Sequence, residues 1–143
     1  MASESSATTV WEGSLTKGRG TTTPASGAIP AVEVTWAART ERTEGATSPE
    51  ELLAAAHASC YCMGLSHGLS EAGHEPERLE ATATVSFIPG EGVKSSHIVV
   101  TGRVPGIDAA AFEAAAADAG QNCPISGALS GNVEITVDAS FED

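Results

Sequence analysis

Alternation of apolar and polar positions predicts the strands in the second half of the chain. Between residues 79 and 87 apolar side chains occupy the odd positions, and a second alternating run covers 98–104 after a turn marked by Gly90 and Gly92. A period of two residues is typical of a strand with one buried face. We therefore predict a long antiparallel hairpin over 79–104 and a last strand over 133–141.

The first half of the chain carries weaker versions of this pattern. Residues 8–12 and 15–23 suit a hairpin whose turn or bulge positions are Gly13, Gly18 and Gly20. Apolar residues alternate over 32–38, which predicts a half-buried strand with Arg39 at its end. Residues 1–7 are predicted to form a flexible tail, and residues 40–47 a polar loop.

A long helix is predicted over residues 48–73. Ser48 suits the N-cap, Pro49 the first helical position and Glu51 the third position of a capping box, while Gly73 marks the end. The stretch 52–66 contains no charged residue. Such a helix is expected to be enclosed by protein on most sides, which would place Cys60 in the core.

Two further helical segments follow the hairpin. Asp108 is placed to cap an alanine-rich helix over 109–119 that stops at Gly120, and a short helical turn begins at Cys123-Pro124. Because strands and helices occur in blocks with antiparallel connections, the predicted fold class is α+β. We predict one domain that spans residues 1–143.

The balance of predicted elements favours a homodimer. The predicted strands expose two faces each, while only two substantial helices are available to cover them, and the longer helix is itself uncharged over most of its length. A second copy of the chain is the simplest source of the missing surface.

Composition then excludes several classes of function. Nineteen acidic residues against seven lysines and arginines give a formal charge of −12, which repels phosphate backbones and anionic membranes. We expect no nucleic-acid partner and no membrane association. The start of the sequence lacks the pattern of a signal peptide, so the expected location is the cytoplasm, where the three cysteines would remain free thiols.

The cysteines do not form a metal motif. On a helix with about 100° per residue, Leu53, His57, Cys60 and Gly64 share one stripe, whereas Cys62 points about 200° away from Cys60. No metal and no cofactor are therefore predicted. Cys123 differs, because a Cys-Pro at a helix start lies beside unpaired N–H groups that favour a thiolate.

Taken alone, each of these residues also has a purely structural interpretation. Cys60 and Cys62 could be small apolar residues of a packed helix, and Cys123 an apolar contact at a cap. His57 could be a core histidine that donates to a carbonyl. Arg39 and Glu50 could be solvated surface charges.

Four segments together resemble a known family. SPEELLAAAHASCYCMGLS, VPGID, CPISGAL and the N-terminal WEGSLTKGRG are similar to the OsmC branch of the OsmC/Ohr family of thiol-dependent hydroperoxide reductases, and the resemblance spans nearly the whole chain. It implies an intertwined homodimer in which strongly bent antiparallel sheets surround two central helices. It also implies two active sites at the interface.

The resemblance implies a role for four residues. Cys60 corresponds to the family's peroxidatic cysteine, Cys123 to its resolving cysteine and Glu50 to the acid after the motif's proline. Arg39 is the best match to the family's arginine, although Arg42 remains a second candidate. Cys62 departs from the family pattern, where serine is common.

The activity implied is the reduction of organic hydroperoxides to alcohols by two cysteines, with hydrogen peroxide as a further candidate substrate. An external dithiol would complete the cycle. Two rival readings stay open: an acyl-transfer enzyme in which His57 activates Cys60, and a non-enzymatic dimer that binds an apolar stress ligand.

Overall fold

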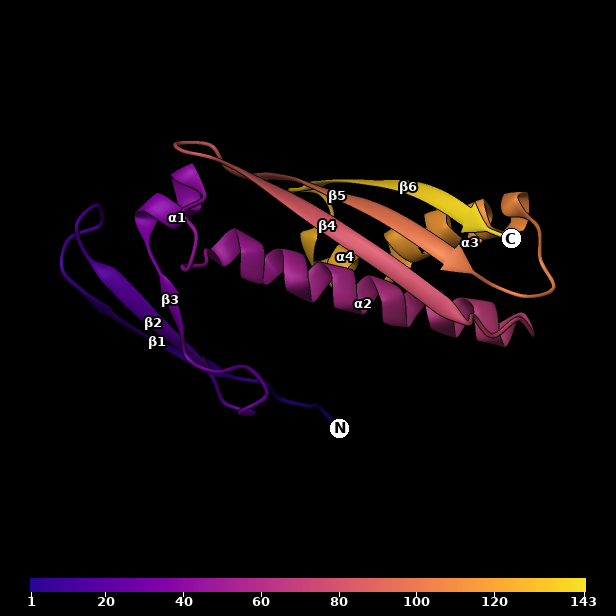
Figure 1. Ribbon diagram of the computed structural model, residues 1–143, viewed down its shortest axis with the longest axis horizontal. Coiled ribbons are helices and arrows are strands. Elements are labelled where there is room, and N and C mark those ends of the chain that lie inside the picture. Colours follow the sequence, from indigo (N-terminus) through magenta and orange to yellow (C-terminus); the bar gives the residue numbers. More distant parts are fainter. The chain divides into compact units, whose positions relative to one another are not determined.

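The computed structural model describes residues 1–143 and contains six strands and four helices (Figure 1). Their order is β1 (Ala7–Glu12), β2 (Arg19–Pro24), β3 (Val32–Val34), α1 (Trp36–Glu41), α2 (Pro49–Glu71), β4 (Arg78–Ile88), β5 (Gly92–Arg103), α3 (Ala109–Asn122), α4 (Pro124–Leu129) and β6 (Glu134–Glu142). The chain divides into two compact units, Met1–Leu52 and Leu53–Asp143, and each is described by itself. The α+β class is confirmed.

The N-terminal unit contains a three-stranded antiparallel sheet in the order β1-β2-β3. The predicted first hairpin is therefore confirmed. Strand β1 begins at Ala7, inside the predicted tail, and the Ala25 N–H extends the pairing by donating to the Ser6 carbonyl at 2.9 Å. Every residue of β1 is exposed in the single chain.

The predicted strand over 32–38 is wrong beyond Val34. Strand β3 ends there, and α1 begins at Trp36, because Thr35 adopts an extended conformation and its hydroxyl accepts from the Ala38 N–H at 3.0 Å. A threonine at the N-cap stabilises the first turn of a helix locally, and this outweighs a short alternation of apolar residues. Arg39 consequently lies in the last turn of a helix and not at a strand end.

Helix α2 forms as predicted, and both of its ends can be read in the hydrogen bonds. The Ser48 hydroxyl accepts from the Glu51 N–H at 3.1 Å, while the Glu51 carboxylate accepts from the Thr47 hydroxyl, so only half of the predicted capping box forms. At the other end Gly73 has a φ of +90°, and the Gly73 and His74 N–H groups donate back to Ser70 and Leu69. This is a Schellman ending, which requires a residue in the left-handed region.

The C-terminal unit contains a second sheet, in the order β4-β5-β6. Strands β4 and β5 form the predicted antiparallel hairpin, with an irregularity between Ser86 and Phe87. Strand β6, however, runs parallel to β5, so the expectation of antiparallel connections is wrong at this edge. The physical reason is the crossover: α3 and α4 lie between the two strands in sequence and carry the chain back to the end at which β5 started.

The core of this unit lies between the sheet and the helices on one of its sides (Figure 1). The fully buried members come from α2, β5 and α3, and include Tyr61, Leu65, Ile98, Val100 and Phe112. Gly102 is required by this packing, because a Cβ there would lie 2.3 Å from the Phe112 ring. The single chain leaves the other face of the sheet exposed, as at Val99.

One stripe of α2 remains exposed in the single chain. It runs along Ala55, Ser59, Met63 and His67 and contains no charge, and Met63 is 74% exposed. Cys60 borders this stripe and is half-buried, so within one chain it packs against the core and is not enclosed by it. None of the helices combines the length and the apolar character that crossing a membrane requires.

Candidate functional site

The side chains of Cys60 and Cys123 meet at the first turn of α4. The Cys60 sulfur accepts a hydrogen bond from the Ile125 N–H at 3.5 Å, and the Cys123 sulfur accepts from the Ser126 N–H at 3.4 Å. The Cys123 side chain also lies within hydrogen-bonding reach of the Cys60 thiol. Two cysteines far apart in sequence are therefore brought together as free thiols.

Two features of the sequence allow this approach. Gly64, one turn after Cys60, leaves room for Cys123, since a Cβ at Gly64 would lie 3.3 Å from the Cys123 Cβ. Cys123 itself is the N-cap of α4, and Pro124 occupies the first helical position, where its missing N–H has no consequence. The prediction that Cys123 lies beside free N–H groups of a helix start is confirmed.

Burial dominates the chemistry of Cys60. Removal from water raises the pKa of the Cys60 thiol above its ordinary value, the Ile125 N–H lowers it, and the neighbouring Cys123 raises it again. The net effect within this unit favours the protonated thiol. A positive charge would be needed to make Cys60 a thiolate near neutral pH.

Cys62 lies apart from the pair. It is half-buried, and burial raises the pKa of its thiol, while a hydrogen bond from the Ala81 backbone lowers it. Its neighbour is thus strand β4, whereas Cys60 faces α4, as the helical spacing predicts. No group of three or more potential metal-binding side chains occurs in the structure.

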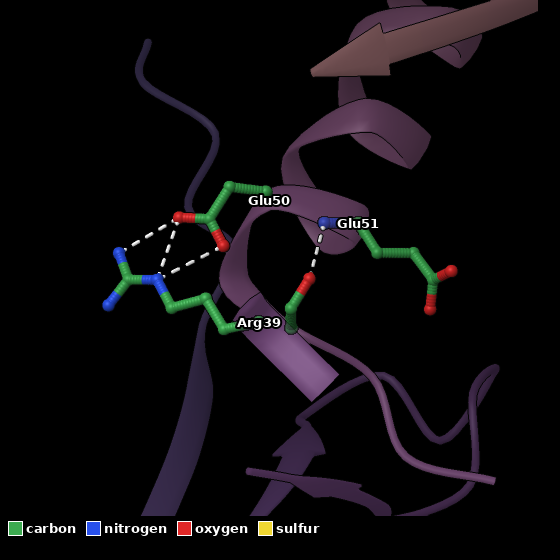
Figure 2. A network of polar contacts seen from close by, with 4 residues as sticks. Arg39, Glu50 and Glu51 are labelled. Atoms are coloured by element: carbon green, nitrogen blue, oxygen red, sulfur yellow. Dashed lines mark hydrogen bonds and ion pairs between the residues drawn. The ribbon is translucent and has the colours of Figure 1, made fainter. Parts of the chain in front are cut away.

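Arg39 and Glu50 form a second cluster, within the N-terminal unit (Figure 2). The Arg39 Nε donates to both carboxylate oxygens of Glu50, at 2.9 and 3.1 Å, and Nη2 lies 2.8 Å from Oε1. Glu50 is buried, and the Trp36 ring lies 5.9 Å from the Arg39 guanidinium carbon. The interpretation of these two residues as solvated charges is therefore wrong, because the pair is oriented and partly removed from water.

The second candidate arginine has a different position. Arg42 is exposed and serves as the C-cap of α1, with a φ of 56°. Of the two arginines, Arg39 makes the pairing with Glu50.

A buried polar chain was not anticipated from the sequence. The His57 Nδ1 lies 2.6 Å from the Ser96 hydroxyl and Nε2 lies 2.8 Å from the Ser126 hydroxyl, which in turn lies 3.1 Å from the Cys123 sulfur. Both ring nitrogens of His57 thus bind serines, not a carbonyl and not Cys60. A signal existed for Ser96, which stands in phase with Ile98 and Val100 on the buried face of a strand.

His57 lies in a buried environment. Its side chain and that of Ser96 are fully buried, and burial lowers the pKa of His57 below its ordinary value. The imidazole is therefore neutral near pH 7, with one nitrogen able to donate and the other able to accept.

Comparison with known proteins places the chain in a family. Residues 42–138 match the family model described as OsmC-like protein. The chain is 39% identical over 131 residues to Peroxiredoxin OsmC of Escherichia coli K12, covering 90% of each chain. It is 33% identical over 104 residues to the organic hydroperoxide resistance protein OhrA of Bacillus subtilis, covering 71% of this chain and 73% of OhrA.

A solved structure agrees with these relatives. The crystal structure of an organic hydroperoxide resistance protein OsmC from Legionella pneumophila superimposes with a TM-score of 0.68 at 25% identity, covering 94% of this chain and 96% of that one. The α+β fold is thus that of the OsmC-like proteins. This chain belongs to the OsmC family.

The burial of neutral His57 predicts a pH dependence of stability. Its folded-state pKa is lowered, so on acidification the unfolded chain binds the proton first. The stability contributed by neutral His57 is complete above the unfolded pKa of about 6.5 and is lost as pH falls below it, by up to about 1.4 kcal/mol per pH unit. Urea unfolding at pH 7.5 and 5.5 measures this loss, which His57→Gln should remove.

His67→Gln is the matched control, because His67 is an exposed histidine of the same helix. It should keep the wild-type difference between the two pH values. An equal loss of stability in wild type and His57→Gln would contradict the assignment.

Proposed function

We propose that this protein is a peroxidase that reduces organic hydroperoxides to alcohols with two cysteines. Cys60 attacks the peroxide and Cys123 resolves the product. The observation that carries this proposal is the meeting of the two thiols at the start of α4. The names of two relatives, a peroxiredoxin and an organic hydroperoxide resistance protein, support the same class of substrate.

The reaction has three steps. The Cys60 thiolate attacks one peroxide oxygen, the O–O bond breaks, and the alcohol leaves after taking a proton, so that Cys60 becomes a sulfenic acid. The Cys123 sulfur then attacks the Cys60 sulfur, water leaves and a disulfide forms. An external dithiol reduces the disulfide and restores both thiols.

Arg39 is proposed to supply the positive charge that Cys60 lacks. A guanidinium does not deprotonate, and its flat fork can bind Glu50 with one edge while another N–H faces a thiolate or a peroxide oxygen. The bidentate contact with Glu50 fixes the direction of that fork. Glu50 is thus a positioning residue for Arg39.

Ionisation of Cys60 explains only part of the rate. A lower pKa increases the fraction of thiolate, but with a Brønsted slope of roughly 0.4–0.5 it also makes each thiolate less nucleophilic. Alignment of the peroxide with the sulfur, and stabilisation of charge on the departing oxygen by Arg39, must supply most of the acceleration.

The preferred substrate follows from the surroundings of Cys60. Its neighbours on α2 are alanines, a tyrosine and a methionine, with no charged side chain between residues 52 and 66. Burial of alkyl surface contributes about 25 cal/mol per Å², so a hydrophobic hydroperoxide gains binding energy that hydrogen peroxide cannot.

We further propose that the active form is a cytoplasmic homodimer, each subunit of which is one domain spanning residues 1–143. The uncharged exposed stripe of α2 supports this, because exposed apolar surface of this kind marks an interface. The family model supports the single domain, since its matched range crosses the boundary between the two units.

The two rival functions receive less support. An acyl-transfer site needs a base beside Cys60. Both ring nitrogens of His57 instead bind serines, and one of these serines, Ser126, contacts Cys123. A protein that only binds an apolar ligand would not need two thiols in contact.

The cysteine assignment is tested by titrating the reduced protein with cumene hydroperoxide. Wild type should consume one equivalent per chain and form a disulfide that mass spectrometry maps to Cys60 and Cys123. Cys60→Ser should lower peroxide consumption by at least about 100-fold, because the nucleophile is absent. Cys123→Ser should react once and then carry a sulfenic acid on Cys60.

Cys62→Ser is the control, since Cys62 faces β4 and should be dispensable for the first turnover. Consumption at the wild-type rate by Cys60→Ser would refute the proposal.

The arginine assignment is tested by comparing Arg39→Lys with Arg42→Lys. Lysine keeps the charge but not the bidentate contact with Glu50, so Arg39→Lys should slow oxidation of Cys60 by about 10- to 100-fold. Arg42→Lys should stay near wild type. The measurement is the rate of Cys60 oxidation at pH 7, and the reverse order of the two variants would assign the role to Arg42.

The dimer is tested by placing a charge on the exposed stripe of α2. Light scattering at micromolar concentration should give twice the 14.4 kDa chain mass for wild type. Met63→Glu should shift the mass toward one chain, because an unpaired charge in an interface is strongly destabilising. Ala110→Glu, in the exposed first turn of α3, is the control and should remain dimeric. A wild-type mass of one chain would rule the dimer out.

A further inference from the structure

An unbroken chain of buried polar groups ends at the proposed resolving cysteine. From the Cys123 sulfur it passes to the Ser126 hydroxyl at 3.1 Å, to the His57 Nε2 at 2.8 Å, and from Nδ1 to the Ser96 hydroxyl at 2.6 Å. All four side chains are at most 2% exposed. Three separate elements, α2, β5 and α4, converge to build it.

The reaction described above gives these three polar residues no role. Cys60, Arg39 and Glu50 serve the attack on the peroxide, but the second step has a requirement of its own. Cys123 must give up its thiol proton to attack, because the thiolate is the nucleophile in sulfur exchange. The Cys123 sulfur is almost fully buried, so solvent has little access to that proton.

We propose that Ser126 and His57 form a proton relay that serves the resolving step. The proposal rests on the two-cysteine function proposed above and deepens it. Ser126 touches the reacting sulfur, whereas His57 acts through Ser126 and is a positioning residue. The relay requires the tautomer of His57 in which the Nδ1–H donates to Ser96, so that Nε2 is the acceptor toward Ser126; the two contact distances permit this tautomer.

The relay balances as follows. As the Cys123 sulfur bonds to the Cys60 sulfur, the thiol proton moves to the Ser126 oxygen and the Ser126 hydroxyl proton moves to the His57 Nε2. The S–O bond of the Cys60 sulfenic acid breaks, and hydroxide leaves with the electron pair. The imidazolium then releases its extra proton through Ser126 to the solvent, and this proton converts the hydroxide to water. The sum is one thiol and one sulfenic acid converted to one disulfide and one water.

His57 is unprotonated before the resolving step. Burial lowers its pKa, so the imidazole is neutral at pH 7 and has a free ring nitrogen, although the same burial makes it a weaker base than an exposed histidine. The titratable groups along the chain are the Cys123 and Cys60 thiols. Tyr61, one turn later on α2, donates its hydroxyl to the Ala116 carbonyl and does not take part. Ser126 also lines a cavity of about 620 Å³ between α3, α4 and β6, which offers an exit for the proton.

The test separates the two chemical steps in a single turnover. Reduced protein is mixed with one equivalent of cumene hydroperoxide and quenched at intervals with dimedone and an alkylating reagent. Mass spectrometry then counts sulfenic acid on Cys60 and the disulfide with Cys123, at several pH values between 6 and 8.5. The variants are Ser126→Ala, Ser126→Thr and His57→Gln. The matched control is Ser130→Ala, because Ser130 is an exposed serine at the end of α4.

The relay predicts a distinct pattern. Ser126→Ala and His57→Gln should oxidise Cys60 within about twofold of wild type but form the disulfide about tenfold or more slowly at pH 7, the scale of general base catalysis. Both defects should shrink as pH rises, because hydroxide reaches the buried Cys123 proton only rarely and its contribution grows with its concentration. Ser126→Thr keeps the hydroxyl and should restore the rate, and Ser130→Ala should match wild type.

Several outcomes would overturn the relay. Disulfide formation at the wild-type rate in His57→Gln would do so, because glutamine can hydrogen-bond to both serines but cannot hold the proton. A defect that is equal at every pH would assign these residues a structural role only. If wild-type protein forms neither sulfenic acid nor disulfide, the two-cysteine function itself fails. If Cys60 is oxidised rapidly and the variants form the disulfide at the wild-type rate, the two-cysteine function stands and only the relay is refuted.

Discussion

The close contact between α2 and the start of α4 is the constraint on which the site depends. It needs small residues where backbones approach: Gly64 faces Cys123, and Gly120 lies where a Cβ would be 2.6 Å from Val137. Because the side chain at each of these two positions is only a hydrogen atom, α2, α3 and β6 can pack closely around the Cys-Pro turn. The Cys60 and Cys123 sulfurs then each accept a hydrogen bond from a backbone N–H in the first turn of α4. A larger residue at Gly64 would press against Cys123, and one at Gly120 would press against Val137.

The same burial that brings the thiols together works against their reactivity. Removal from water raises the pKa of Cys60 and of Cys62, and lowers that of His57, so each group is held in its neutral form. A neutral thiol is a poor nucleophile, whereas a neutral imidazole is a competent base. This difference is why the proposed mechanism calls for a permanent cation at Cys60 and gives the role of base to His57. Within the N-terminal unit, Arg39 is held by a bidentate contact with Glu50. Within the C-terminal unit, His57 is held by Ser96 and Ser126. Every buried polar side-chain atom has a hydrogen-bond partner, so the polar core is fully satisfied.

Local signals in the sequence were reliable where one residue decides one hydrogen bond. Ser48 and Asp108 cap their helices, Gly73 ends α2, and the alternation over 79–87 and 133–141 corresponds to strands β4 and β6. The same reasoning failed over 32–38, where Thr35 caps a short helix that the apolar alternation had concealed. It also failed on the direction of β6, because the pairing of a strand depends on the path of the connecting helices. Alternation records which face of a strand is buried, not which way the chain runs.

The sequence alone named the candidates for the reactive residues. Cys60, Cys123, Arg39 and Glu50 were proposed from the resemblance to the OsmC/Ohr family, and Cys123 also carried a local signal, a Cys-Pro at a helix start. Only the tertiary structure decided which groups surround them. His57 contacts Ser96, which is 39 positions away, and Ser126, which is 69 positions away. No local pattern in the sequence links these residues. Their hydrogen bonds exist because packing removes all three from water at the same point, where each polar group must find a partner among the others.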